Sequence, residues 1–169
     1  MKNVFLLFTL ISATCFAQKP CEKDSVYNQF DFWVGEWNVY AKNGQLAGTS
    51  KITEILDNCV ILEEWTSVGA QQGLVFSGKS FNSYNALTKQ WQQNWIDNTG
   101  GTTEFLTGSF SNNVMQFLSR PFSTGQNSSS IRRLSFYNLE NGKVRQFGEI
   151  SSDEGKTWKT EYDLEYRKK

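Results

Sequence analysis

The side chains best suited to acid–base chemistry are the carboxylates, and Glu63 and Glu64 form a conspicuous adjacent pair in the run CVILEEW. Neighbouring residues on a strand point to opposite faces, so these two cannot act together as acid and base. Glu63 could meet Asp97 or Glu149 from other strands, but the sequence spacing does not fix such a meeting. We therefore predict no catalytic residues, with a carboxylate-dependent hydrolase or isomerase as a less favoured alternative.

Histidine is absent, which excludes Ser-His-Asp and Cys-His nucleophiles, imidazole-bound zinc and histidine-ligated haem. The sequence has no Gly-rich phosphate loop, serine nucleophile elbow or carboxylate cluster at metal spacing. The 17 Lys and Arg residues balance 17 Asp and Glu residues, so net charge gives no reason to expect nucleic acid. We predict no cofactor, no metal and no nucleic-acid partner.

The N-terminal residues 1–17 have a basic start, an apolar run too short for a membrane span, and small residues ending at Ala17. This pattern is typical of a secretory signal peptide, so we expect export to the periplasm or beyond, cleavage near Ala17 and no transmembrane segment. Two cysteines then remain, and an exported chain with an even number usually pairs them. We predict a disulfide between Cys21 and Cys59, with two free thiols as the alternative.

The rest of the chain alternates apolar and polar residues with a period of two, which predicts about ten short strands separated by turn residues. The predicted strands span residues 32–41, 48–56, 60–67, 74–84, 91–97, 103–110, 114–120, 131–138, 144–151 and 158–167. Short connections require antiparallel neighbours, and a long meander must close or leave two open edges. We predict an all-β, closed up-and-down barrel over residues 30–169 after an N-terminal arm at 18–29, with an open sandwich as the alternative.

Two predicted strands separate their faces clearly. The face predicted to be buried in the last strand holds Trp158, Thr160, Tyr162, Leu164 and Tyr166. In the first strand, one face holds Trp33, Gly35, Trp37 and Val39. Alternation of this kind is typical of strands with one wet face.

Aromatic residues make up 15% of the chain, including six Trp. Most are expected in the core, but in a small barrel they can also line a cavity for a flat or aliphatic molecule. Polar residues that interrupt apolar strands need partners if they point inward. The predicted ligand-binding residues are Trp33, Glu63, Trp65, Asn82, Tyr84, Trp91, Trp95, Asp97 and Arg132. The predicted function is binding of an apolar or amphiphilic small molecule, and the alternative is a glycan- or protein-interaction module without an internal ligand.

The run FDFWVGEW contains Gly35-Glu36-Trp37, the Gly-X-Trp that opens the first strand of lipocalins and their calycin relatives. With the runs CVILEEW, GKSFNSY, WQQNWID and SSDEGKTW, the chain resembles an uncharacterised family of secreted bacterial lipocalin-like proteins over nearly its whole mature length. The resemblance implies a calycin-like barrel with Trp37 plugging one end, where we expect Arg167 to stack on the indole. Nitrobindin-type barrels are more distantly similar, but they hold haem through a histidine that this chain lacks.

The run SSDEGKTW also resembles the Asp-box of bacterial sialidases. We expect Asp153 to accept backbone N–H groups, Gly155 to take a positive φ and Trp158 to pack beneath the turn. The box is a structural hairpin in propeller enzymes, so a single copy predicts no glycosidase activity.

Overall fold

The computed structural model describes residues 19–70, 73–125 and 128–169, so the predicted signal peptide lies outside the described residues. Within these ranges the helical elements are α1 (Pro20–Lys23), η1 (Ser25–Trp33) and η2 (Glu140–Gly142). The strands are β1 (Gly35–Ala41), β2 (Leu46–Ile55), β3 (Val60–Ser67), β4 (Ser77–Asn85), β5 (Gln90–Asp97), β6 (Thr102–Ser111), β7 (Val114–Ser119), β8 (Phe122–Gly125), β9 (Ser128–Asn138), β10 (Val144–Ser151) and β11 (Lys159–Lys168). No helix in the described part of the chain is long and apolar enough to cross a membrane.

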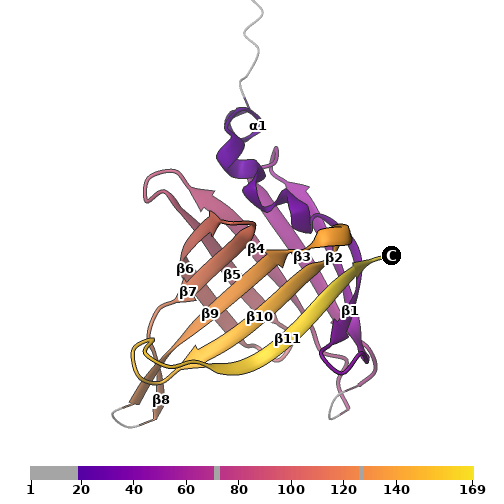
Figure 1. Ribbon diagram of the computed structural model, residues 1–169, viewed down its shortest axis with the longest axis vertical. Helices are drawn as coiled ribbons and strands as arrows, with labels where there is room; N and C mark the ends of the chain where they lie inside the picture. Colours follow the sequence, from indigo (N-terminus) through magenta and orange to yellow (C-terminus); the bar gives the residue numbers. More distant parts are fainter. Residues whose placement is uncertain (1–18, 71–72, 126–127) are drawn as a thin grey trace, which may run out of the picture.

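Ten of these strands form a closed antiparallel barrel, in the order β1 to β7 followed by β9, β10 and β11. β11 pairs with β1, and this pairing closes the ring (Figure 1). β8 lies outside the ring as a hairpin partner of β9, in a segment that the sequence predicted to be a loop. The predicted fold class, an all-β up-and-down barrel, is confirmed.

The two ends of the barrel differ. α1 lies beside one end, where the chain also terminates, and β8 projects at the other (Figure 1). Because the strands run up and down, the β1–β2, β3–β4, β5–β6 and β10–β11 connections all meet at the β8 end. We call the α1 end the closed end and the β8 end the open end.

The closed end is filled by the 3-10 helix η1, which carries Phe30 and Trp33 into the barrel. Their rings stack with centroids 5.0 Å apart, and both pack on Phe136. The predicted first strand was therefore wrong at its start: β1 begins at Gly35, and Trp33 belongs to the helix rather than sharing a strand face with Trp37. Phe30 and Trp33 supply the core from outside the sheet, which a strand alternation could not indicate.

Trp37 is fully buried at the closed end, where its Nε1 donates to the Trp33 carbonyl at 2.8 Å. The cation on its indole is Lys168, whose Nζ lies 4.3 Å from the ring centroid. The prediction of Arg167 in this place was wrong, because Arg167 stacks on Tyr40 instead, 4.1 Å from that centroid. Lys168 is the cross-strand partner of Trp37, and the preceding Arg167 side chain therefore points to the other face.

β11 contains a β-bulge that the sequence did not reveal. Gly148 pairs with Tyr162, whereas Glu149 pairs with Thr160, so Glu161 is an extra residue on β11. Such an insertion shifts the alternation of side chains by one on its far side. The bulge is therefore the point where the two faces of β11 exchange.

The exchange corrects the predicted buried face of the last strand. Tyr162 and the residues after it follow the predicted alternation, with Tyr166 buried inside. Thr160 and Trp158 lie beyond the bulge and do not share that face. The Trp158 ring instead lies 4.1 Å from the guanidinium carbon of Arg133, which neighbours the inward-facing Leu134 on β9 and so points outward.

The β10–β11 turn has the expected Asp-box contacts. Asp153 Oδ1 accepts from the Thr157 backbone N–H at 2.8 Å, and Gly155 has a φ of +86°. The indole Nε1 of Trp158 donates to the Gly155 carbonyl at 3.0 Å. Hydrogen bonds from Thr157 lower the pKa of Asp153 to about 2. These contacts are local to the hairpin, in agreement with a structural role.

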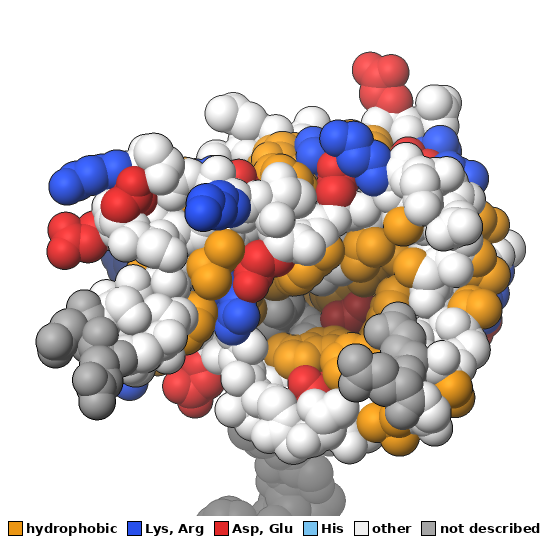
Figure 2. All heavy atoms as spheres, turned by 90° about the horizontal axis from the view of Figure 1, so that it is seen from below, with side chains coloured by type: hydrophobic (Ala, Val, Ile, Leu, Met, Phe, Trp, Pro, Cys, Tyr) orange, Lys and Arg blue, Asp and Glu red, His pale blue; other side chains and the backbone are white. Residues whose placement is uncertain are grey.

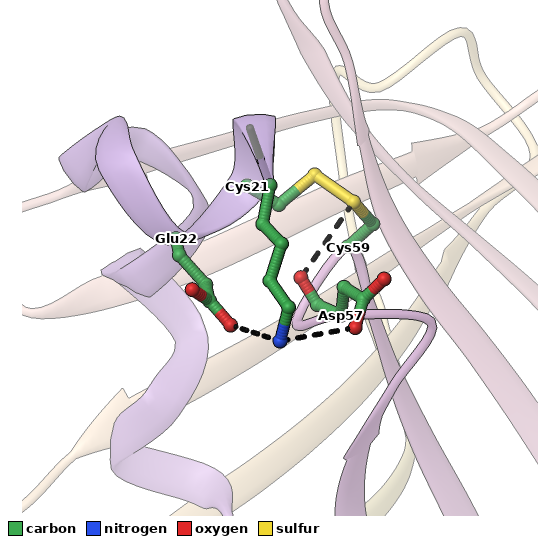
Figure 3. The surroundings of a disulfide bond; sticks show 5 residues. Cys21, Glu22, Asp57 and Cys59 are labelled. Carbon is green, nitrogen blue, oxygen red and sulfur yellow. Dashed lines mark hydrogen bonds and ion pairs between the residues drawn. A yellow bond between two sulfur atoms is a disulfide. The ribbon is translucent and has the colours of Figure 1, made fainter. Parts of the chain in front are cut away.

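A disulfide joins Cys21 of α1 to Cys59 of the β2–β3 turn, with Cα atoms 5.1 Å apart, and confirms the predicted bridge (Figure 3). Lys19 reinforces the same junction by contacting Glu22 at 2.8 Å and Asp57 at 3.2 Å (Figure 3). The N-terminal arm is thereby attached to the closed end, where η1 enters the barrel.

Candidate ligand-binding cavity

The open half of the barrel is hollow. Its cavity has a volume of about 790 Å³, which lies within the range of small-molecule sites. Figure 2, viewed from the open end, shows the hollow with hydrophobic side chains around its walls and an acidic side chain within it. The apolar lining consists of Leu46, Ala47, Trp65, Val68, Phe76, Trp95, Phe105, Leu134, Tyr162 and Leu164.

Glycines in neighbouring strands allow the large aromatic rings to lie against the wall. A Cβ at Gly48 would lie 2.7 Å from Cη2 of Trp65, and a Cβ at Gly78 would lie 2.6 Å from Cη2 of Trp95. Gly148 stands in the same relation to Tyr162. No real Cβ fits so close, so larger residues at these glycines would displace the rings. The glycines thus leave the centre of the cavity open.

The floor of the cavity is polar and centres on Glu63, whose exposed fraction is 2%. Its Oε1 lies 2.9 Å from Ser50 Oγ and 3.0 Å from the Tyr166 hydroxyl, and its Oε2 accepts from Ser80 Oγ at 3.0 Å. Burial raises the pKa of Glu63, although these hydroxyl contacts oppose the rise. Glu64 points outward to Lys79, as the alternation of the strand predicted.

A chain of amides continues the polar layer across the barrel. Asn82 Nδ2 donates to the Ile61 carbonyl and to Ser80 Oγ, both at 3.0 Å. Asn82 Oδ1 then accepts from Gln93 Nε2 at 2.7 Å. On the opposite side, the Tyr166 hydroxyl lies 2.9 Å from Gln146 Oε1. This layer separates the hollow half from the aromatic core below it.

Charged groups gather at the mouth of the cavity. Arg132 Nε lies 2.9 Å and 3.1 Å from the two carboxylate oxygens of Glu161, and its guanidinium lies over the Phe122 ring. The Asp97 carboxylate accepts from the backbone N–H groups of Thr99 at 2.9 Å and Gly101 at 3.1 Å. Hydrogen bonds, first among them from the Thr99 hydroxyl, lower the pKa of Asp97. Asp97 is therefore ionised at neutral pH.

The structure places the predicted ligand-binding residues in three regions. Those that line the cavity are Glu63, Trp65, Trp95, Asp97 and Arg132. Asn82 lies within the polar floor without lining the cavity. Trp33, Tyr84 and Trp91 pack in or against the closed-end core, outside the cavity lining.

The cavity is also lined by four residues that were not among the predicted ligand-binding residues: Gln93, Gln146, Tyr162 and Tyr166. Gln93 had a readable signal, because it alternates with Trp91 and Trp95 along one strand. Glu149, considered as a partner for Glu63, instead lies 2.8 Å from Arg133 in an outer ion pair. Among the described residues, no group of three or more Cys, Asp or Glu side chains is arranged to hold a metal ion.

The fold and the cavity define a closed β-barrel that is packed at one end and hollow at the other. No family model matches the chain, and no curated protein matches it.

Proposed function

We propose that this protein binds an apolar or amphiphilic small molecule inside the open half of its barrel, as a lipocalin-like carrier. The observation that carries the proposal is the unequal filling of the barrel. A buried cluster rich in aromatic side chains packs the closed end, whereas the aromatics of the open end lie against glycines around a cavity of about 790 Å³.

The cavity wall suits an apolar ligand body. Trp65, Trp95 and Tyr162 line it, and burial of an apolar body against them contributes roughly 25 cal/mol for each Å² of apolar surface removed from water. Exposed apolar residues at the open end, namely Leu46, Val68, Leu74 and Val75, extend this surface to the mouth. An apolar molecule can thus remain in contact with apolar side chains as it enters.

The proposal includes export and similarity to lipocalin-like proteins. The Cys21–Cys59 disulfide fits an oxidising compartment. Intact-mass measurement of the protein isolated from its host would find a chain beginning at Gln18. A chain retaining residues 1–17 would contradict the predicted cleavage.

Fluorescence titration tests binding directly. The neutral probe N-phenylnaphthylamine should bind saturably, with increased emission, and members of a panel of fatty acids, sterols, flavonoids and tetrapyrroles should displace it. Thr103→Trp, which adds bulk at the cavity lining, should weaken binding. Leu87→Trp is the matched control, because Leu87 is 96% exposed and remote from the lining. An absence of saturable binding across probe and panel would overturn the proposal and direct attention to the outer surface.

A further inference from the structure

We propose that the polar end of the ligand is a protonated amine, which enters the cavity and pairs with the carboxylate of Glu63 at its floor. The inference rests on the proposed function and names its ligand class. It follows from the direction of the hydrogen bonds in the floor, the charges that face the cavity and the aromatic walls above them.

The Ile61 backbone carbonyl can only accept hydrogen bonds, so it sets the donor and acceptor roles of the neighbouring amides. Because Asn82 Nδ2 donates to this carbonyl, Asn82 Oδ1 must be the acceptor that faces Gln93. Gln93 therefore uses its Nε2 as the donor, which leaves its Oε1 as the end of the amide without a partner among the described residues. Gln93 is 3% exposed and lines the cavity, so the floor presents this oxygen to a ligand.

The same series of hydrogen bonds sets the direction in which the Ser80 hydroxyl donates. Its Oγ accepts from Asn82, so its hydroxyl proton is free to point at Glu63 Oε2. Glu63 therefore acts as an acceptor at Oε2. Oε1 of Gln93, on β5, is a second acceptor. Because the floor presents hydrogen-bond acceptors, it favours a ligand whose polar end carries several hydrogen-bond donors. An ammonium group provides three N–H donors, whereas an alcohol provides one O–H and a carboxylate provides none.

The charges facing the cavity favour a cation. Glu63, Asp97, Glu161 and Arg132 line it, and Arg132 is held by Glu161. Lys51 and Lys79 lie beside Glu64 on the outer face. Among the described residues, Glu63 has hydroxyl partners and no cationic one.

Aromatic side chains complete the recognition of a cation. Trp65, Trp95, Phe76 and Tyr162 surround the cavity above the floor. Ring faces attract ammonium groups, most strongly when both are shielded from water. The same walls accept the apolar body, so one cavity accommodates both parts of an amine-bearing amphiphile.

Binding has a defined proton balance. Burial raises the pKa of Glu63, which makes the carboxyl group hold its proton more tightly than an exposed one does. Asp97, Glu161 and Arg132 are the other charged groups in the cavity lining, and the Tyr162 and Tyr166 hydroxyls, also in the lining, have raised pKa values. An ammonium ion favours the ionised carboxylate, so any proton that Glu63 holds passes to solvent when the amine binds. Up to one proton is therefore released for each amine bound.

The test compares three ligands with one apolar body: naphthylethylamine, naphthylethanol and naphthylacetate. Titration calorimetry at neutral pH should show the amine binding at least about tenfold more tightly than the alcohol, equivalent to about 1.4 kcal/mol. The carboxylate should bind most weakly. Repeating the titration in buffers of different ionisation enthalpy should reveal proton release with the amine alone.

Glu63→Gln should reduce amine affinity to that of the alcohol for the same variant and abolish proton release. Glu64→Gln, on the outer face of the same strand, is the matched control and should preserve the preference for the amine. Equal binding of all three ligands by the unmodified protein would overturn the amine assignment and leave the proposed function standing. Absence of binding by all three, and by N-phenylnaphthylamine, would overturn both.

Discussion

At the level of single residues, Asp31 and Glu64 are carboxylates outside the cavity lining whose pKa values shift in opposite directions. Asp31 in η1 lies near Glu54 of β2, whereas Glu64 pairs with Lys79. Partial burial and the charge of Glu54 raise the pKa of Asp31 to about 6, and Lys79 lowers that of Glu64. The ionised form of Asp31 is thus disfavoured in the folded protein.

Asp31→Asn should therefore stabilise the protein at neutral pH. The folded state binds the proton more tightly than the unfolded state, so stability falls as pH rises from the ordinary pKa of 3.8 towards about 6. The variant removes this cost, and a gain of about 1 kcal/mol is expected after allowance for solvent screening. Urea unfolding across pH would measure it. A gain that persists at pH values below 3.8 would show that titration of Asp31 is not its origin.

Trp37→Ala should lower the free energy of unfolding by about 3 to 5 kcal/mol, since it deletes a fully buried indole and its contact with Lys168. Trp37→Phe retains much of the core volume and should lose less. Thermal unfolding monitored by circular dichroism would compare the three proteins. An alanine variant that melts within about one or two degrees of the unmodified protein would contradict the packing at the closed end.

At the level of elements, the strands could be predicted because alternation and turn residues are local signals. Two features depended on contacts that sequence does not contain. The bulge at Glu161 is visible only from the register with β10, and η1 is stable because Phe30 and Trp33 enter the completed barrel. The inward direction of Arg132 follows from its place on β9 two residues before the buried Leu134.

The Cys21–Cys59 disulfide attaches one element, α1, to the β2–β3 turn. Replacing both Cys21 and Cys59 with serine should reduce stability by about 3 to 4 kcal/mol, because the bridge restricts a loop that spans a sequence separation of 38 in the unfolded chain. Urea unfolding of the variant and of reduced, unmodified protein should give matching midpoints. Equal stability of the oxidised protein and the variant would mean that α1 contributes little through this tether.

Considered as a whole molecule, the barrel divides at the polar layer around Glu63. Alternation in the sequence could group aromatic and polar residues by strand face, but it could not tell which face points inward or assign a residue to the packed or the hollow end. Trp91 and Trp95 illustrate this limit, because they occupy the same face of β5 and yet belong to the core and to the cavity wall. Their separation depends on how deeply η1 penetrates, which is a property of the assembled barrel.

This division predicts unequal stability along the same strands. Amide hydrogens beside the closed-end core should exchange only on global unfolding, whereas β8, which among the described residues pairs with β9 alone, should exchange through local opening. A bound ligand should increase protection around the cavity mouth while changing the closed end less, because only the mouth gains contacts. Hydrogen exchange measured by mass spectrometry, with and without saturating N-phenylnaphthylamine, would resolve the two ends. Uniform protection in the free protein would contradict the division, and protection gained mainly at the closed end would place the ligand outside the cavity.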